Sequence, residues 1–204
     1  MSGVKIKICG MTCREDIELV NSLGVDMAGF VMFFPKSRRN LSLERAAELA
    51  AGLKGIKSAA VTVSPTAEQA RAIERAGFDF LQVHGELSEE MYNSTELPII
   101  RAFNDFGIVE LVRCSRLERV KAFLFDAAEP GSGKLCDRDK LTGLPLAGRE
   151  LILAGGLTPD NVSEAIASVR PNMVDVSSGV ERRGGGKDPE LARRFVEAVR
   201  VFSG

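Results

Sequence analysis

A cysteine stands at the end of the first strand-like run of the chain, residues 5–9. Ile6 and Ile8 fall on one face of a period-two element, while Lys5, Lys7 and Cys9 fall on the other. A neighbouring ammonium group favours the thiolate, which is the form of cysteine that acts as a nucleophile or base. A buried cysteine that packs as a small apolar side chain is the alternative. The residues that converge with Cys9 must decide between the two.

Polar residues also interrupt other runs that are otherwise apolar, and each lies late in its run. They are Lys7, Gln82, His84, Arg101, Asp126, Asp175 and Ser177. Each has a structural explanation when taken singly, such as a buried ion pair between Lys7 and Asp175. Burying all of them without a use is costly, so as a set they indicate one polar site at the strand ends.

Eight apolar runs of about six residues alternate with amphipathic segments along the whole chain. The predicted strands are Val4–Gly10, Met27–Phe33, Lys57–Val63, Phe80–Gly85, Pro98–Phe103, Lys121–Ala127, Glu150–Gly156 and Met173–Gly179. The predicted helices are Cys13–Leu23, Ser42–Leu53, Thr66–Ala76, Ser88–Asn93, Ile108–Glu118, Asp137–Gly143, Pro159–Val169 and Asp188–Val201. Capping signals at Thr12, Ser42 and Thr66 mark three of the helix starts.

This alternation predicts a single α/β domain over residues 1–204 with a parallel sheet. An open doubly wound sheet is possible, but eight regular repeats fit a closed (β/α)8 TIM barrel better. No GxGxxG fingerprint follows the first strand, which argues against a dinucleotide-binding sheet. The chain is short for a (β/α)8 barrel, which typically has about 250 residues, so its loops must be lean.

Glycine clusters follow the last two predicted strands. Gly155 and Gly156 lie between the seventh strand and its helix, and Ser178 and Gly179 follow the eighth. Glycine lets the backbone approach a ligand, and loops after strands 7 and 8 are the usual phosphate site of this fold. Each cluster alone could be a tight turn, but together they predict phosphate binding.

The loop after the second strand, Phe33–Asn40, is basic and aromatic. A solvated charge run is its ordinary meaning. On the rim of the predicted site, however, a guanidinium of Arg38 or Arg39 could hold a carboxylate through two hydrogen bonds. The glycine-rich loop after Asp126 is either a lid or a permissive connection.

The composition excludes several classes of protein. A net charge of −1 gives no reason to expect nucleic acid as a partner. No apolar run approaches the roughly 20 residues of a membrane helix, and no signal-peptide core is visible, so we expect a cytoplasmic protein with reduced cysteines and no membrane partner. One histidine and no matched cysteine pairs make a metal site improbable.

Several motifs resemble those of the phosphoribosylanthranilate isomerase family, and they occur in the same order along the chain. They are Lys7–Thr12, Gly29–Val31, Pro35–Arg39, Gln82–Gly85, Gly131–Lys134, Ala154–Val162 and Val174–Glu181. Members of this family are (β/α)8 enzymes of tryptophan biosynthesis.

The resemblance implies an Amadori rearrangement of N-(5-phosphoribosyl)anthranilate with Cys9 as general base and Asp126 as general acid. It implies no cofactor. It also implies that Arg39, with Arg38 as the alternative, contacts the anthranilate carboxylate, and that Asp175 orients the substrate or this arginine. His84 matches the family motif and is given a supporting role in substrate binding.

The resemblance also places the phosphate on the amides around Gly155, Gly156, Ser178 and Gly179. The chain departs from the family in the loop after Asp126, where only Ala127 to Pro130 precede the Gly-Ser-Gly-Lys run. This shortening bears on loop closure and turnover rate more than on the reaction.

Other classes remain to be weighed. A barrel similar to indole-3-glycerol-phosphate synthase would need more lysine and glutamate at the strand ends, and one similar to pentose-phosphate epimerase would need metal ligands. A barrel that only binds a phosphosugar or a partner enzyme would not need both Cys9 and Asp126. The sequence leaves a monomer or a homodimer open.

Overall fold

Eight parallel strands close into a barrel in this computed structural model, which describes residues 3–103, 107–126 and 146–203. Each strand pairs with the next along the chain, and the last pairs with the first. The strands are β1 (Lys5–Cys9), β2 (Met27–Val31), β3 (Lys57–Val63), β4 (Phe80–His84), β5 (Ile99–Phe103), β6 (Val120–Phe125), β7 (Glu150–Leu153) and β8 (Met173–Val176). The prediction of a closed (β/α)8 barrel is confirmed; that residues 1–204 form one domain stays a prediction.

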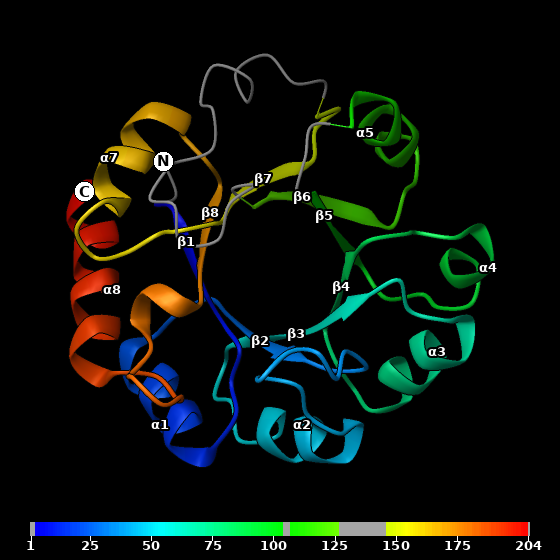
Figure 1. Cartoon of the computed structure of the whole chain (residues 1–204). Helices are drawn as coiled ribbons and strands as arrows, with labels where there is room; N and C mark the ends of the chain where they lie inside the picture. Colours follow the sequence, from blue (N-terminus) through cyan, green and yellow to red (C-terminus); the bar gives the residue numbers. More distant parts are fainter. Residues whose placement is uncertain (1–2, 104–106, 127–145, 204) are drawn as a thin grey trace.

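Helices ring the strands on the outside (Figure 1). They are α1 (Arg14–Leu23), α2 (Leu43–Ala50), α3 (Ala67–Arg75), α4 (Glu89–Tyr92), α5 (Ile108–Ser115), α7 (Val162–Val169) and α8 (Pro189–Ser203), with a 3₁₀ turn η1 at Ser178–Val180. The predicted helix Asp137–Gly143 and the loop after Asp126 lie outside the described residues. None of the helices in the described ranges combines the length and apolar character of a membrane span.

Capping explains two of the three predicted helix starts. The Ser42 hydroxyl accepts a hydrogen bond from the Arg45 N–H, and Thr66 forms a reciprocal capping box with Gln69. The prediction for Thr12 is wrong, because Cys13 is the residue that precedes α1 and its side chain caps nothing. Thr12 instead donates through its backbone N–H to an Asp16 carboxylate oxygen at 2.8 Å.

The alternation of side chains along the strands divides the core into two layers. One parity, including Ile6, Ile8 and Phe30, packs between the strands and the helices. The other fills the barrel and consists of Met27, Ala59, Ile100, Ala102, Ala122, Leu124, Ile152, Ala154 and Met173. Lys7 and Cys9 share the inward parity of β1, so they belong to the barrel interior.

Arg101 is the exception among the polar residues of the strands. Its neighbours Ile100 and Ala102 point into the barrel, so Arg101 points toward the helical layer. Its guanidinium donates to the carbonyl oxygens of Val83 at 2.9 Å and Gly85 at 2.5 Å. Arg101 therefore ties β4 and β5 together and does not join the predicted site.

Candidate active site

Most of the predicted site residues meet in a pocket of about 280 Å³ at the carboxyl ends of the strands. Its lining includes Cys9, Arg39, Gln82, His84, Asp126, Gly155, Gly156, Asp175, Ser177 and Ser178. These residues come from β1, β4 and β8 and from the segments that follow β2, β6, β7 and β8. The fold thus brings together residues that are up to 169 positions apart in the chain.

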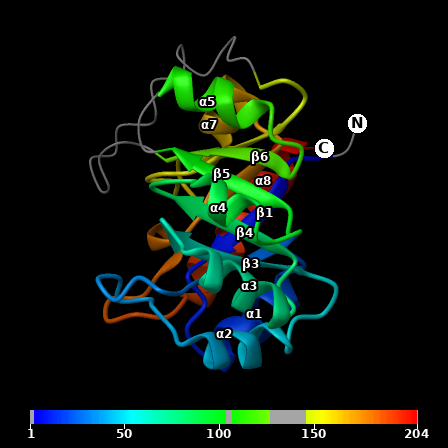
Figure 2. The same cartoon turned by 90° about the vertical axis from the view of Figure 1, so that its right-hand side faces the viewer.

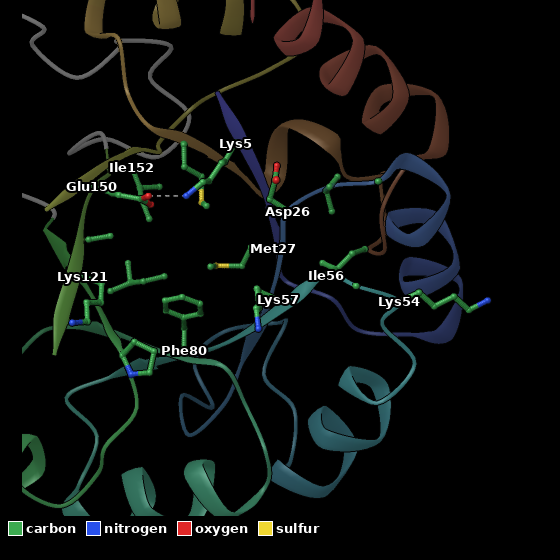
Figure 3. A pocket seen from close by; sticks show the side chains of 17 residues that line it. Lys5, Asp26, Met27, Lys54, Ile56, Lys57, Phe80, Lys121, Glu150 and Ile152 are labelled. Carbon is green, nitrogen blue, oxygen red and sulfur yellow. Dashed lines mark hydrogen bonds and ion pairs between the residues drawn. The ribbon is translucent and has the colours of Figure 1, made fainter. Parts of the chain in front are cut away.

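A larger cavity of about 650 Å³ opens at the opposite mouth of the barrel (Figure 3). Its floor is apolar, with Met27, Phe80 and Ile152, and its Lys5 is paired with Glu150 at 2.6 Å. None of the predicted site residues reaches it. Volume does not identify the active site here, because catalytic groups of (β/α)8 barrels gather at the carboxyl ends of the strands.

Lys7 and Asp175 form a buried ion pair across the β1–β8 seam of the barrel. They are register neighbours, and Lys7 Nζ lies 2.9 Å from Asp175 Oδ2. Their side chains are 0% and 7% exposed. Burial alone would lower the pKa of Lys7, but Asp175 and Cys9 together outweigh it and raise that pKa, so the ammonium stays charged. Asp175 Oδ1 has no partner among the described residues, which leaves it available to a ligand.

The thiol of Cys9 lies beside this pair, and two opposing effects act on its ionisation. Burial raises the pKa of the Cys9 thiol, and the opposing effect of Lys7 does not overcome it. Lys7 does favour the thiolate, as the sequence led us to expect, but desolvation outweighs the ammonium and the pKa of the thiol lies above its ordinary value.

Gly29 on β2 makes room for this thiol. A Cβ added at residue 29 would lie 2.7 Å from Cys9 Sγ and 3.1 Å from Lys7 Nζ. Because β1 and β2 are register neighbours at Cys9 and Gly29, no side chain other than hydrogen fits at this point.

Asp126 directly follows β6, and its backbone N–H donates to the Phe103 carbonyl oxygen at 3.0 Å. Burial, together with the negative charge of Asp175, raises the pKa of the Asp126 carboxyl from 3.8 to about 6, although Lys7 opposes the shift. A carboxyl group with such a pKa can carry a proton near neutral pH and donate it, as a general acid must.

Arg39, not Arg38, lines the pocket. Its guanidinium makes a two-pronged contact with Glu181, Nε to Oε1 at 2.6 Å and Nη2 to Oε2 at 2.8 Å. The Arg39 side chain is 24% exposed, whereas Arg38 is 61% exposed and contacts the same carboxylate from outside the pocket. Of the two arginines that the sequence left open, Arg39 is the one in reach of a ligand.

Gln82 and His84 form a polar pair on β4. Their side-chain nitrogens Nε2 lie 2.8 Å apart, and both residues line the pocket. Gln82 Oε1 is buried and has no partner among the described residues. Exchanging the two ends of the amide group would place the oxygen on His84 and the NH₂ group toward the pocket. Either way, β4 offers a polar group to a ligand.

The two glycine loops lie together on one side of the pocket. Gly155 and Gly156 have φ angles of 84° and 63°, which glycine adopts without strain. The backbone N–H groups of Gly155, Gly156, Ser178 and Gly179 meet no acceptor in the described part of the chain. Such a cluster of unpaired donors suits an anion.

Gly179 has a different role from its neighbours. It does not line the pocket, and a Cβ at this position would lie 1.9 Å from the Leu157 carbonyl oxygen. Glycine at 179 therefore lets the loops after β7 and β8 pack against each other, and any contribution to phosphate binding comes from its backbone.

Two residues near the site were missed by sequence reasoning. Glu181 entered it only as the end of a motif, and Lys187 lies in a glycine-rich charged stretch that is typical of an exposed loop. Both are nearly fully buried, and Lys187 Nζ lies 3.0 Å from Glu181 Oε1. Local composition gave no signal, because their burial depends on loops from three distant parts of the chain.

Within the described ranges, no group of three His, Cys, Asp or Glu side chains is arranged to hold a metal ion. The closed barrel and the acid–base groups at its carboxyl end define a (β/α)8-barrel enzyme.

Comparison with known proteins gives the family. Residues 6–198 match the model of N-(5'-phosphoribosyl)anthranilate isomerase. The chain is 39% identical over 198 residues to the isomerase of that name from Streptococcus mutans, which covers 96% of this chain and 98% of the relative. The chain belongs to the N-(5'-phosphoribosyl)anthranilate isomerase family, and is an isomerase of tryptophan biosynthesis.

Solved structures agree. The phosphoribosyl anthranilate isomerase of Thermotoga maritima superposes with a TM-score of 0.85 at 33% identity, covering 97% of this chain and 99% of that one. The Thermus thermophilus enzyme gives 0.83 at 32% identity with the same coverage. A further isomerase structure, with a TM-score of 0.82 at 31% identity and again the same coverage, is a complex with reduced 1-(o-carboxyphenylamino)-1-deoxyribulose 5-phosphate.

Replacing Asp126 with Asn should stabilise the protein above pH 6. The folded-state pKa of about 6 lies above the unfolded value of 3.8, so ionisation of Asp126 costs stability as pH rises through this window. Two pKa units correspond to about 3 kcal/mol at most. Urea unfolding should show Asp126→Asn more stable at pH 8 and the difference gone at pH 3; an equal difference at both pH values would contradict the raised pKa.

Gly29→Ala should displace the Cys9 thiol. The added methyl group overlaps Sγ, so we expect a loss of about 1–3 kcal/mol in the free energy of unfolding and a fall in kcat of about 10²-fold. In a Cys9→Ala background most of the stability loss should disappear, because the overlap with Sγ is gone and only the looser contacts with Lys7 Nζ at 3.1 Å and Cys9 Cα at 3.2 Å remain. A loss that is unchanged in this background would show that Sγ is not the obstacle.

Proposed function

We propose that this isomerase converts N-(5'-phosphoribosyl)anthranilate into 1-(2-carboxyphenylamino)-1-deoxyribulose 5-phosphate with Cys9 as general base and Asp126 as general acid. The observation that carries the proposal is that both groups line one pocket and that the pKa of Asp126 is raised to about 6.

Ring opening is the first step. Asp126 donates its proton to the furanose ring oxygen, and the C1′–O bond breaks as that oxygen becomes a hydroxyl group. The nitrogen lone pair forms the C1′=N bond of an iminium ion, and Asp126 is left as a carboxylate. A positioned acid of this kind contributes roughly 10²–10⁴-fold to the rate.

Proton abstraction is the second step. The Cys9 thiolate removes the C2′ proton, and the electrons of that C–H bond form the C1′=C2′ bond of an enolamine while the iminium nitrogen is neutralised. The Asp126 carboxylate then takes up the C2′ hydroxyl proton while the Cys9 thiol gives its proton to C1′, which forms the ketone and restores both groups. The positive charges of Lys7 and Lys187 face the thiolate and oppose the burial that raises its pKa. A thiol with a raised pKa is the stronger base once it is ionised.

Binding of the substrate divides the pocket into three regions. The phosphate lies on the N–H groups of Gly155, Gly156, Ser178 and Gly179, which have no described acceptor. The anthranilate carboxylate lies on Arg39, which follows β2. In the order of strands around the barrel, Cys9 on β1 therefore stands between the carboxylate region and the phosphate region after β7 and β8. The ligand in the related complex carries both a phosphate and a carboxylate, which suits this division.

The sugar hydroxyls lie between these two ends. Asp175 Oδ1 and the Gln82 side chain are buried polar groups with unused hydrogen-bonding capacity, and both line the pocket. His84 holds Gln82 at 2.8 Å and thus supports it. Asp175 contacts Lys7 and not Arg39, so of the two roles that the resemblance implied for it we keep the one toward the substrate.

Cys9→Ala and Asp126→Asn should each lower kcat by at least about 10²-fold while KM stays close to the wild-type value, since each group acts in a proton transfer. The assay follows the loss of anthranilate-type fluorescence from freshly generated substrate. Full activity in either variant would reject the role of that residue. Absence of turnover in the wild type, with phosphate-competitive binding intact, would favour the binding-only barrel.

Arg39→Ala should mainly raise KM, because it removes a charge-assisted contact to a part of the substrate that does not react. Arg38→Ala is the matched control and should change KM little, since Arg38 does not line the pocket. A raised KM for Arg38→Ala with an unchanged one for Arg39→Ala would reverse the assignment. The sequence leaves monomer and homodimer open for this chain; the isomerase of Thermotoga maritima is dimeric and has also been studied as monomers.

A further inference from the structure

Glu181 is a nearly buried carboxylate surrounded by cations from two other segments. Its side chain is 5% exposed and is contacted by Arg38 and Arg39 from the loop after β2 and by Lys187 from the segment before α8. Burial alone would raise the pKa of Glu181, but Arg39 and Lys187 lower it to about 2, so the carboxylate is always ionised at neutral pH. Three cations against one carboxylate leave this cluster positive.

Lys187 fixes the far side of the carboxylate. Its buried ammonium lies 3.0 Å from Glu181 Oε1 and donates to the Ser177 carbonyl oxygen at 3.2 Å. Its backbone N–H donates to Asp16 Oδ1 at 2.8 Å, and the other oxygen of Asp16 accepts from Thr12. The loop that carries Lys187 is thereby tied to the segment that follows Cys9.

The loops that meet in this cluster project on the same side of the barrel. Figure 2 shows the loop after β2, in blue, and the loop after η1, in orange, next to each other. The Arg39 side chain also packs closely on Gly10, since a Cβ at residue 10 would lie 2.5 Å from Arg39 Cδ. The methylene chain of Arg39 therefore packs on the backbone at Gly10, and Glu181 binds its guanidinium.

The contact with Glu181 uses only one edge of the Arg39 guanidinium. A guanidinium has five N–H donors in a rigid plane. Nε and one hydrogen of Nη2 point to Glu181, so the edge formed by Nη1 and the other hydrogen of Nη2 is left for a second carboxylate. Bidentate recognition of a carboxylate depends on how this edge is oriented.

We propose that Glu181 and Lys187 are positioning residues that orient the free edge of Arg39 toward the ligand, and that they thereby set the preference for a carboxylated over an uncarboxylated arylamine sugar phosphate. This inference rests on the proposed contact between Arg39 and the substrate carboxylate. Glu181 acts through Arg39, and Lys187 acts through Glu181.

The test compares two ligands that differ only in the carboxylate. One is reduced 1-(o-carboxyphenylamino)-1-deoxyribulose 5-phosphate, and the other is the same compound with an unsubstituted phenyl ring. Binding of each is measured by calorimetry. Glu181→Gln should weaken the first ligand by about tenfold or more and the second by less than about twofold, because a neutral amide cannot orient a guanidinium as a carboxylate does.

Three further variants make the test specific. Lys187→Gln should change the preference in the same direction, and it replaces Glu181→Gln if that variant does not fold. In an Arg39→Ala background, Glu181→Gln should cause no further loss of preference. Glu150→Gln, which removes a carboxylate partner of Lys5 at the opposite mouth of the barrel, is the matched control and should affect neither ligand.

The outcomes separate this inference from the proposed function. Equal weakening of both ligands by Glu181→Gln would make Glu181 merely structural and overturn the inference. Retained preference in Glu181→Gln, with preference lost in Arg39→Ala, would overturn it while leaving the role of Arg39 intact. Retained preference in Arg39→Ala would instead reject the proposed contact between Arg39 and the carboxylate.

Discussion

The buried ion pair of Lys7 and Asp175 is the interaction on which the site depends. Placing two charges inside a barrel costs desolvation energy, which the 2.9 Å contact offsets only while both partners remain. The pair lies where the first and last strands close the barrel, so the same contact joins the seam and places charge beside Cys9 and Asp126. An apolar pair at this position could join the two strands but would place no charge beside Cys9 and Asp126, and an exposed pair would be screened by water.

The two proposed proton-transfer groups, Cys9 and Asp126, differ in which charges lie near them. Desolvation raises the pKa of both Cys9 and Asp126, but Asp126 also faces the negative Asp175, whereas Cys9 faces the positive Lys7 and Lys187. The result is a carboxyl group with a pKa of about 6 and a thiol whose ionised form lies beside two cations. This arrangement reduces the stability of the folded protein above pH 6, as is common where function requires a buried ionisable group.

A second set of charges organises the rim. Glu181 and Lys187 are far in sequence from Cys9 and Asp126. Glu181 binds the Arg39 guanidinium, and Lys187 binds Glu181. Arg39 also packs on Gly10, the residue next to Cys9. Loops that follow β1, β2 and β8 are thus connected through one carboxylate. Cys9, Arg39 and the loop after β8 are therefore linked on one side of the pocket, while the glycine loops at Gly155 and Ser178 form the other side.

Local pattern determined the strands, most helices, and which polar residues lie at the strand ends, because period-two alternation and turn residues are properties of neighbouring positions. Cys9, Asp126 and the two glycine loops could be chosen from this alone. The tertiary structure decided the rest. Which residues of β5 face the barrel interior could not be predicted from the sequence, because the adjacent Ile99 and Ile100 are both apolar. The register of β5 with β4 and β6 decides it, and it places Arg101 outside the site. The pKa of Cys9 and the burial of Glu181 and Lys187 depend on desolvation and on loops distant in the chain, and no local pattern carries that information.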